Sequence, residues 1–173
     1  ILSWIIRNPI IGMVDIGFVP RGQQDLIKKI AAVTTGIQLL VVVMLWIAFN
    51  ATDGSFQFME RGEWIPSLGI AYILGVDGLS LPMVALNALI AFLGIFVSWK
   101  IDRAVKGYFA LFLLLDTGIM GVFLSLDFFL FYVFWEVMLL PMYFLIGMWG
   151  GPQREYAAIK FFLYTLFGSV LML

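Results

Sequence analysis

The strongest chemical signal in the sequence is a single carboxylate inside an apolar run. Glu136 is the only charged residue between positions 128 and 153. An ionisable group in the hydrocarbon core costs about 2.5–3.5 kcal/mol even on lenient insertion scales, so it normally serves an ion or proton site. We therefore predict that Glu136 takes up and releases protons. The alternative is a permanently protonated glutamate that only packs, through a hydrogen bond, against a neighbouring helix.

Pro141 adds a second signal five residues further on. Proline has no N–H, so it cannot donate to the carbonyl of Val137, which leaves a backbone acceptor near the carboxylate. Interrupted helices that line hydrated cavities are a common way to build ion sites in membrane proteins. We expect a helix break at Pro141 that belongs to the Glu136 site.

Two further charged residues fall inside apolar runs. Asp116 is followed by Gly118 and Gly121, which would allow a neighbouring helix to approach closely, so a proton path and simple packing both remain open for it. Lys160 is either a proton-path partner of Glu136 or a lysine that extends its ammonium group to the membrane surface.

The composition excludes many kinds of site. The chain has 173 residues, of which 63% are hydrophobic and 12% charged, and it contains no His and no Cys. A soluble domain is nearer half apolar and one quarter charged, so these values indicate a multi-pass membrane protein. Without His and Cys, the usual iron–sulfur, haem, zinc and histidine-relay chemistry is excluded, and we expect no cofactor and no metal. The net charge of −1 gives no basic surface for nucleic acid.

Runs without charge predict the elements that position these residues. The runs 30–52 and 78–99 hold 23 and 22 residues, enough to cross a bilayer at about 1.5 Å per residue. The segment 52–75 has loop chemistry, with an alternation that suits a short hairpin, and Asp77 is predicted to cap the helix that follows. We predict an all-α polytopic transmembrane bundle with helices near 1–20, 29–51, 76–98, 107–126, 128–149 and 157–173.

The basic residues predict how the bundle is oriented. They concentrate in alternate loops, whereas the opposite loops contain only Arg61. Under the positive-inside rule the N-terminus faces outward and the basic loops face the cytoplasm, and we expect a bacterial cytoplasmic membrane. The basic residues of the alternate loops are Arg21, Lys28, Lys29, Lys100, Arg103, Lys106 and Arg154.

Four stretches resemble a known family. They are FWEVMLLPMYFLIGMWGG at 134–151, REYAAIKFFLYT at 154–165, LGVDGLSLPM at 74–83 and GVFLSLD at 121–127. Together they are similar to the antiporter-like membrane subunits of proton-pumping NADH:quinone oxidoreductase, respiratory complex I, in the branch called subunit M or chain 4. Residues 1–63 match this family only in pattern.

The resemblance implies both a fold and a function. Family members are fourteen-helix proteins with two inverted five-helix repeats, related to Mrp-type cation/proton antiporters. They contain no redox centre and translocate protons when NADH-to-quinone electron transfer proceeds in other subunits. Their partners are the other membrane subunits of the complex, especially neighbouring antiporter-like ones. Glu136 corresponds to the functional glutamate of helix five, which in the family pairs with a lysine on helix seven.

The resemblance also implies how the chain is divided. Residues 1–106 would be N-terminal helices one to three with the outer loop 52–75, and 107–173 would begin the first repeat with helices four to six. We expect an N-terminal fragment of a longer protein, with the partner lysine beyond Leu173. A subunit of an Mrp-type antiporter or of a membrane-bound hydrogenase, and a purely structural membrane scaffold, remain as alternatives.

Overall fold

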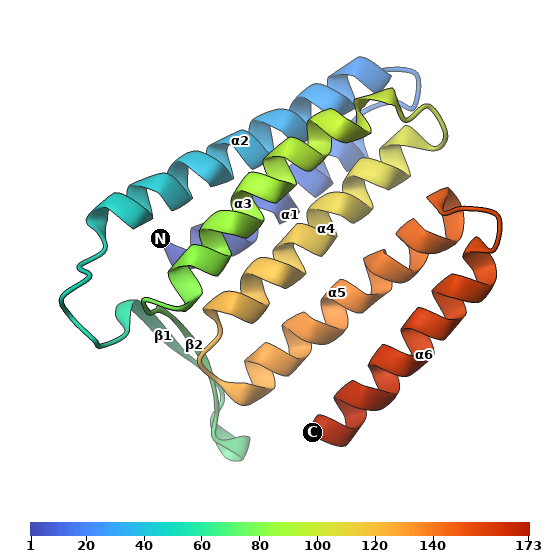
Figure 1. The fold of residues 1–173 in the computed structure, drawn as a ribbon. Coiled ribbons are helices and arrows are strands. Elements are labelled where there is room, and N and C mark those ends of the chain that lie inside the picture. The colour runs from blue at the N-terminus through green and yellow to red at the C-terminus, as the bar shows by residue number, and fades with distance from the viewer.

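Six helices run up and down in sequence order, and a β-hairpin lies between the second and the third (Figure 1). The computed structural model describes residues 1–173. The predicted bundle of six helices is confirmed, although only five are long and apolar enough to cross a membrane. The exception is α1, which has 17 residues and contains Arg7 and Asp15. The helices are α1 (Leu2–Phe18), α2 (Gln24–Ala48), α3 (Ser80–Val97), α4 (Val105–Leu124), α5 (Phe128–Trp149) and α6 (Arg154–Met172).

The helix ends differ from the predicted ones where polar residues join the helix. The predicted range of α5 is confirmed, but α2 begins five residues earlier than predicted and α6 three residues earlier. Runs without charge mark the part of a helix that fits hydrocarbon, whereas the helix itself continues into the polar boundary. Lys28 and Lys29 therefore lie in the first turns of α2, where the sequence placed a loop.

The segment after α2 forms the suggested hairpin. Strand β1 (Gln57–Ile65) pairs antiparallel with β2 (Ile70–Val76). The turn between them ends at Gly69, whose φ of 68° lies in the left-handed region that suits glycine. Because β2 continues to Val76, α3 starts four residues later than predicted, at Ser80. The backbone N–H of Leu126 donates to the carbonyl of Ile73 at 2.9 Å and ties the hairpin to the turn between α4 and α5.

Carboxylates cap two helices at the hairpin end of the bundle. Asp77 accepts hydrogen bonds from the backbone N–H groups of Leu79 and Ser80, at 3.1 and 2.6 Å, which confirms its predicted capping role. The hydrogen bonds from Ser80 hold the pKa of Asp77 below its usual range. Asp127, at the start of α5, accepts from the N–H of Leu130 at 3.0 Å.

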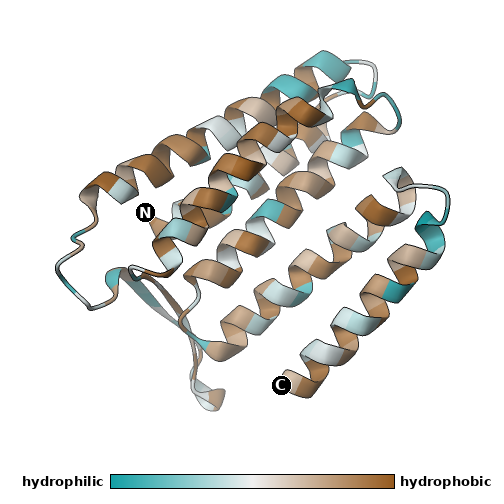
Figure 2. Ribbon diagram, viewed as in Figure 1, coloured by the Kyte–Doolittle hydropathy of each residue, from teal (hydrophilic) through white to brown (hydrophobic).

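Lysines satisfy helix carbonyls at the opposite end. The ammonium group of Lys28 donates to the carbonyl of Trp99 at 2.7 Å, just after α3. Lys106 donates to the carbonyls of Gly17 and Val19 at the end of α1, at 2.7 and 2.9 Å. Cations stabilise helix C-termini because the unpaired carbonyls there carry partial negative charge. Figure 2 shows hydrophilic residues gathered at this end, with hydrophobic residues along the helices.

Helices α1–α4 pack around the core, whereas α5 packs on α4 and α6 packs on α5 (Figure 1). Two glycines allow α4 and α5 to approach closely. A Cβ atom on Gly118 would lie 2.7 Å from the Cβ of Met138, and one on Gly121 would overlap the ring of Phe134. The close approach predicted for these glycines is confirmed.

Candidate functional site

Glu136 meets a hydroxyl group from the neighbouring helix. It is half-buried and lies eight residues into α5, about 12 Å along the helix from its start. Ser169 of α6 donates a hydrogen bond from its Oγ to Oε1 of Glu136 at 2.7 Å. Ser169 is only 4% exposed. Tyr132, one turn before Glu136, lies beside both groups. The candidate site is therefore a carboxylate, a buried hydroxyl and a phenol on two packed helices.

Sequence reasoning missed Ser169, because serine carries no charge and interrupts an apolar run only slightly. The distances of Glu136 and Ser169 from the turn between α5 and α6 could have indicated that the two residues meet. Glu136 lies 13 residues before the end of α5, and Ser169 lies 15 residues after the start of α6. Antiparallel helices joined by a short turn place residues at similar distances from the turn at similar depth, so the two side chains were candidates to meet.

Pro141 does not interrupt α5. The helix continues from Phe128 to Trp149 with Pro141 inside it. The expected break is therefore reduced to one missing donor, because proline cannot supply the N–H that the Val137 carbonyl normally receives. A single missing hydrogen bond is tolerated within an otherwise regular helix when packing holds both sides, and Pro141 is buried.

Asp116 lies in a second polar cluster, inside the group formed by α1–α4. It is 3% exposed and accepts a hydrogen bond from Nδ2 of Asn87 on α3 at 2.7 Å. Gln38 of α2 lies beside the carboxyl group, whose second oxygen has no partner. Gln38 also donates to the carbonyl of Ile5 at 3.3 Å. Pro9 cannot supply the helical N–H to that carbonyl, which explains why a side chain from another helix binds it.

The two membrane acids lie at similar depth on opposite sides of the contact between α4 and α5. Asp116 is eight residues from the end of α4, and Glu136 is eight residues from the start of α5. Gly118 and Met138, each two residues further along, form the contact between the helices. Two residues turn a helix by about 200°, so both acids point away from that contact. The structure therefore does not join Asp116 directly to Glu136.

Lys160 is distant from Glu136. It is exposed, and its Nζ lies 5.6 Å from the centre of the Tyr156 ring. It precedes Ser169 by nine residues, which is about 13 Å along α6. Lys160 forms no ion pair with Glu136.

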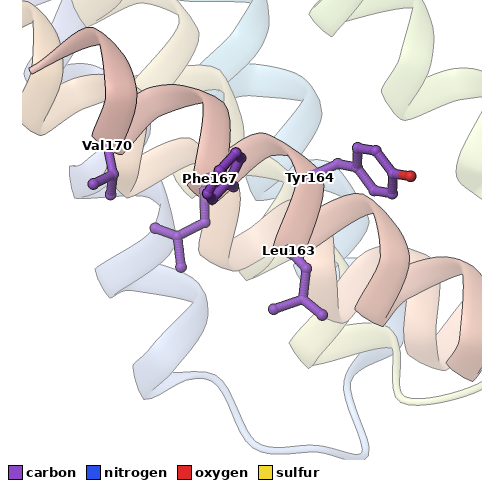
Figure 3. A pocket seen from close by; sticks show the side chains of 5 residues that line it. Leu163, Tyr164, Phe167 and Val170 are labelled. Carbon is purple, nitrogen blue, oxygen red and sulfur yellow. The ribbon is translucent and has the colours of Figure 1, made fainter.

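Glu136 does not belong to a cluster of metal-ligating side chains. His, Cys, Asp and Glu residues do not gather in groups of three or more that could hold a metal ion. An apolar hollow lies along exposed residues of α6 (Figure 3). Its lining contains no charged residue, so it suits lipid or another apolar helix face. The lining residues are Leu163, Tyr164, Leu166, Phe167 and Val170.

Comparisons with known proteins agree on one family. Residues 125–173 match the family model described as "NADH:quinone oxidoreductase/Mrp antiporter, TM". NADH-quinone oxidoreductase subunit M of Rhodobacter capsulatus is 42% identical over 100% of this chain and 34% of its own length. NADH-ubiquinone oxidoreductase chain 4 of Arabidopsis thaliana is 40% identical over 99% of this chain and 35% of its own length. The chain thus spans about a third of the length of these relatives.

Solved structures share the fold. Respiratory complex I from Thermus thermophilus contains a chain that is 25% identical, with a TM-score of 0.82 over 98% of this chain and 33% of that chain. The Mrp complex from Dietzia sp. contains a chain that is 20% identical, with a TM-score of 0.69 over 96% of this chain and 18% of that chain. The sequence and the fold together lead to one conclusion. The chain is an integral membrane segment whose residues 125–173 match the NADH:quinone oxidoreductase and Mrp antiporter transmembrane model, and it is similar to subunit M and chain 4 over nearly its whole length.

Proposed function

We propose that the chain belongs to a membrane subunit that translocates protons, driven by NADH-to-quinone electron transfer in other subunits. Glu136 is the carboxylate that takes up and releases the proton, and the subunit has no redox centre or cofactor of its own. The observation that supports this proposal is the half-buried Glu136, hydrogen-bonded to Ser169 within the residues that match the family model.

The surroundings of Glu136 favour a change of charge. Lys160, the lysine of α6, lies about two and a half turns from Ser169 along the helix. Glu136 forms no ion pair, so no cation of these six helices neutralises its ionised form. An unpaired charge in an apolar region is costly, and protonation removes that cost. A cation that approaches Glu136 from the rest of the subunit stabilises the ionised form and releases the proton. Proton occupancy therefore follows the ionic state of the surroundings.

The other polar groups have supporting roles. Asp116 and Lys160 are secondary candidates for the proton path, because one is buried at the depth of Glu136 and the other lies near the basic end of the bundle. That basic end faces the cytoplasm, and the membrane is the bacterial cytoplasmic membrane. The partners are other membrane subunits of the complex, especially neighbouring antiporter-like ones.

Replacement of Glu136 tests the proposal directly. Glu136→Gln in the full-length subunit, within the assembled complex in sealed vesicles, should abolish or severely reduce proton pumping, because the amide cannot carry the proton. Glu136→Asp should retain part of the activity, since the charge survives with a shorter reach. Proton-to-electron stoichiometry is measured alongside the amount of assembled complex.

Glu63→Gln is the matched control, because Glu63 is exposed on strand β1 outside the membrane helices. Normal stoichiometry in Glu136→Gln would overturn the proposed role of Glu136. Co-purifying subunits decide between a complex of the NADH dehydrogenase type and an Mrp-type antiporter, whose solved chain shares the fold.

A further inference from the structure

The Ser169 hydroxyl has one proton and two acceptors. Its Oγ lies 2.7 Å from Oε1 of Glu136 and 2.9 Å from the carbonyl oxygen of Leu166 on its own helix. A hydroxyl group donates only one hydrogen bond at a time, although it accepts others through its lone pairs. The Ser169 hydroxyl can therefore donate its proton either to the Glu136 carboxyl group across the helix interface or to the Leu166 carbonyl of α6, but not to both at once.

We propose that the Ser169 hydroxyl rotates with the charge state of Glu136 and so positions this carboxyl group in both states. When Glu136 is ionised, Ser169 donates to its carboxylate. When Glu136 is protonated, its O–H donates to Oγ of Ser169, and Ser169 turns its own proton to the Leu166 carbonyl. No covalent bond forms or breaks at Ser169, and the only proton exchanged is that of Glu136. The inference rests on the proposed function only in that Glu136 exchanges a proton.

Burial of Ser169 makes its hydroxyl, rather than water, the hydrogen-bond partner of Glu136. Ser169 is only 4% exposed, so water has little access to take the place of its hydroxyl group. Tyr132 is the other polar group beside Glu136, and it comes from the same helix. Asp116 of α4 points away from the contact with α5. Among the described helices, Ser169 is therefore the hydrogen-bond partner that another helix supplies to Glu136.

Thr165 provides an internal comparison one turn earlier on α6. Its hydroxyl donates to the carbonyl of Phe161 at 2.8 Å, which is the local bond that serine and threonine often make inside helices. Thr165 has no acceptor on another helix. A hydroxyl with a purely local role would resemble Thr165, whereas Ser169 combines the local acceptor with the carboxyl group of Glu136.

Infrared difference spectroscopy on the assembled complex tests the inference. The C=O stretch of protonated Glu136 is identified as the band that Glu136→Gln removes. Ser169→Ala should move this band to higher wavenumber, because the acid loses the acceptor of its O–H. Ser169→Thr keeps a hydroxyl group and should restore the band to its original position. Ser169→Ala should also slow pumping about two- to tenfold, as expected for the loss of one hydrogen bond.

Thr165→Val is the matched control, and it should leave the Glu136 band unmoved. An unmoved band in Ser169→Ala overturns the inference, and so does an equal shift in Thr165→Val, which would indicate a general change in the packing of α6. All spectra are compared for equal amounts of assembled complex. If Glu136→Gln pumps normally, the proposed function fails, while the band position in Ser169→Ala still decides whether Ser169 follows Glu136.

Discussion

Asp116 and Glu136 have different hydrogen-bond partners, although both are acids inside membrane helices. Asp116 is almost fully buried and meets the side-chain amides of Asn87 and Gln38 inside the α1–α4 group. Glu136 is half-buried and meets the hydroxyl of Ser169 at the edge of the described helices. The N–H of Asn87 only donates to Asp116, whereas the hydroxyl of Ser169 can both donate to Glu136 and accept from it.

Substitutions at Asp116 should separate its structural role from proton transfer. Asp116→Asn should reduce pumping less than Glu136→Gln does, because it retains an oxygen for Asn87. Asp116→Leu leaves the Asn87 amide without its acceptor and should lower the stability by about 1–3 kcal/mol. Pumping in vesicles and thermal unfolding of the complex measure the two effects.

Lys160→Ala should also reduce pumping less than Glu136→Gln does. A loss of pumping in Asp116→Asn or Lys160→Ala equal to that in Glu136→Gln would contradict this ranking.

The contact between α4 and α5 depends on the absence of side chains at two positions. Gly118 and Gly121 face Met138 and Phe134 with no space for a Cβ atom. The sequence predicted the close approach, since glycines in a membrane helix commonly mark a packing face. It could not predict which residues of α5 lie opposite, because that depends on the rotation of each helix about its axis. The same limit applies to the hydrogen bond between Asn87 and Asp116, since it also depends on which faces of α3 and α4 meet.

A single methyl group should test this contact. Gly121→Ala places its Cβ in the ring of Phe134, so α4 and α5 must separate or Phe134 must move, and the complex should unfold at lower temperature. Gly17→Ala is the control, because a Cβ there meets nothing within 4 Å and alanine favours a helix. Thermal unfolding and the yield of assembled complex provide the measurement. Equal stability of the two variants would show that the helices tolerate a wider spacing.

At the scale of the whole molecule, the loops separate by charge between the two ends of the bundle. The loops α1–α2, α3–α4 and α5–α6 lie at one end, and the hairpin with the α4–α5 turn lies at the other (Figure 1). The sequence predicted this arrangement, because an up-and-down chain brings alternate loops to the same side. The structure adds a second role for two of the basic residues, Lys28 and Lys106, which satisfy helix carbonyls.

Introduced cysteines test the orientation, since the chain contains no cysteine of its own. Gly22→Cys and Gly151→Cys lie at the basic end, and Gly54→Cys lies at the hairpin end, all at positions with space for a side chain. In intact cells an impermeant maleimide should label only Gly54→Cys, and opened membranes should allow all three to react. Labelling is read on the peptide that contains each introduced cysteine. The reverse pattern would contradict the proposed orientation.

The sequence by itself determined that the chain is an integral membrane protein with six helices, because the energetic cost of polar groups in hydrocarbon depends on local composition. The same cost made Glu136 the predicted proton site. Only the tertiary structure showed that Oγ of Ser169 lies 2.7 Å from Oε1 of Glu136 and that Asp116 lies on the other side of the α4–α5 contact. The physical reason is that a helix turns by about 100° per residue. Which face of a helix contacts its neighbour is therefore set by packing between distant segments, and it cannot be predicted from local composition.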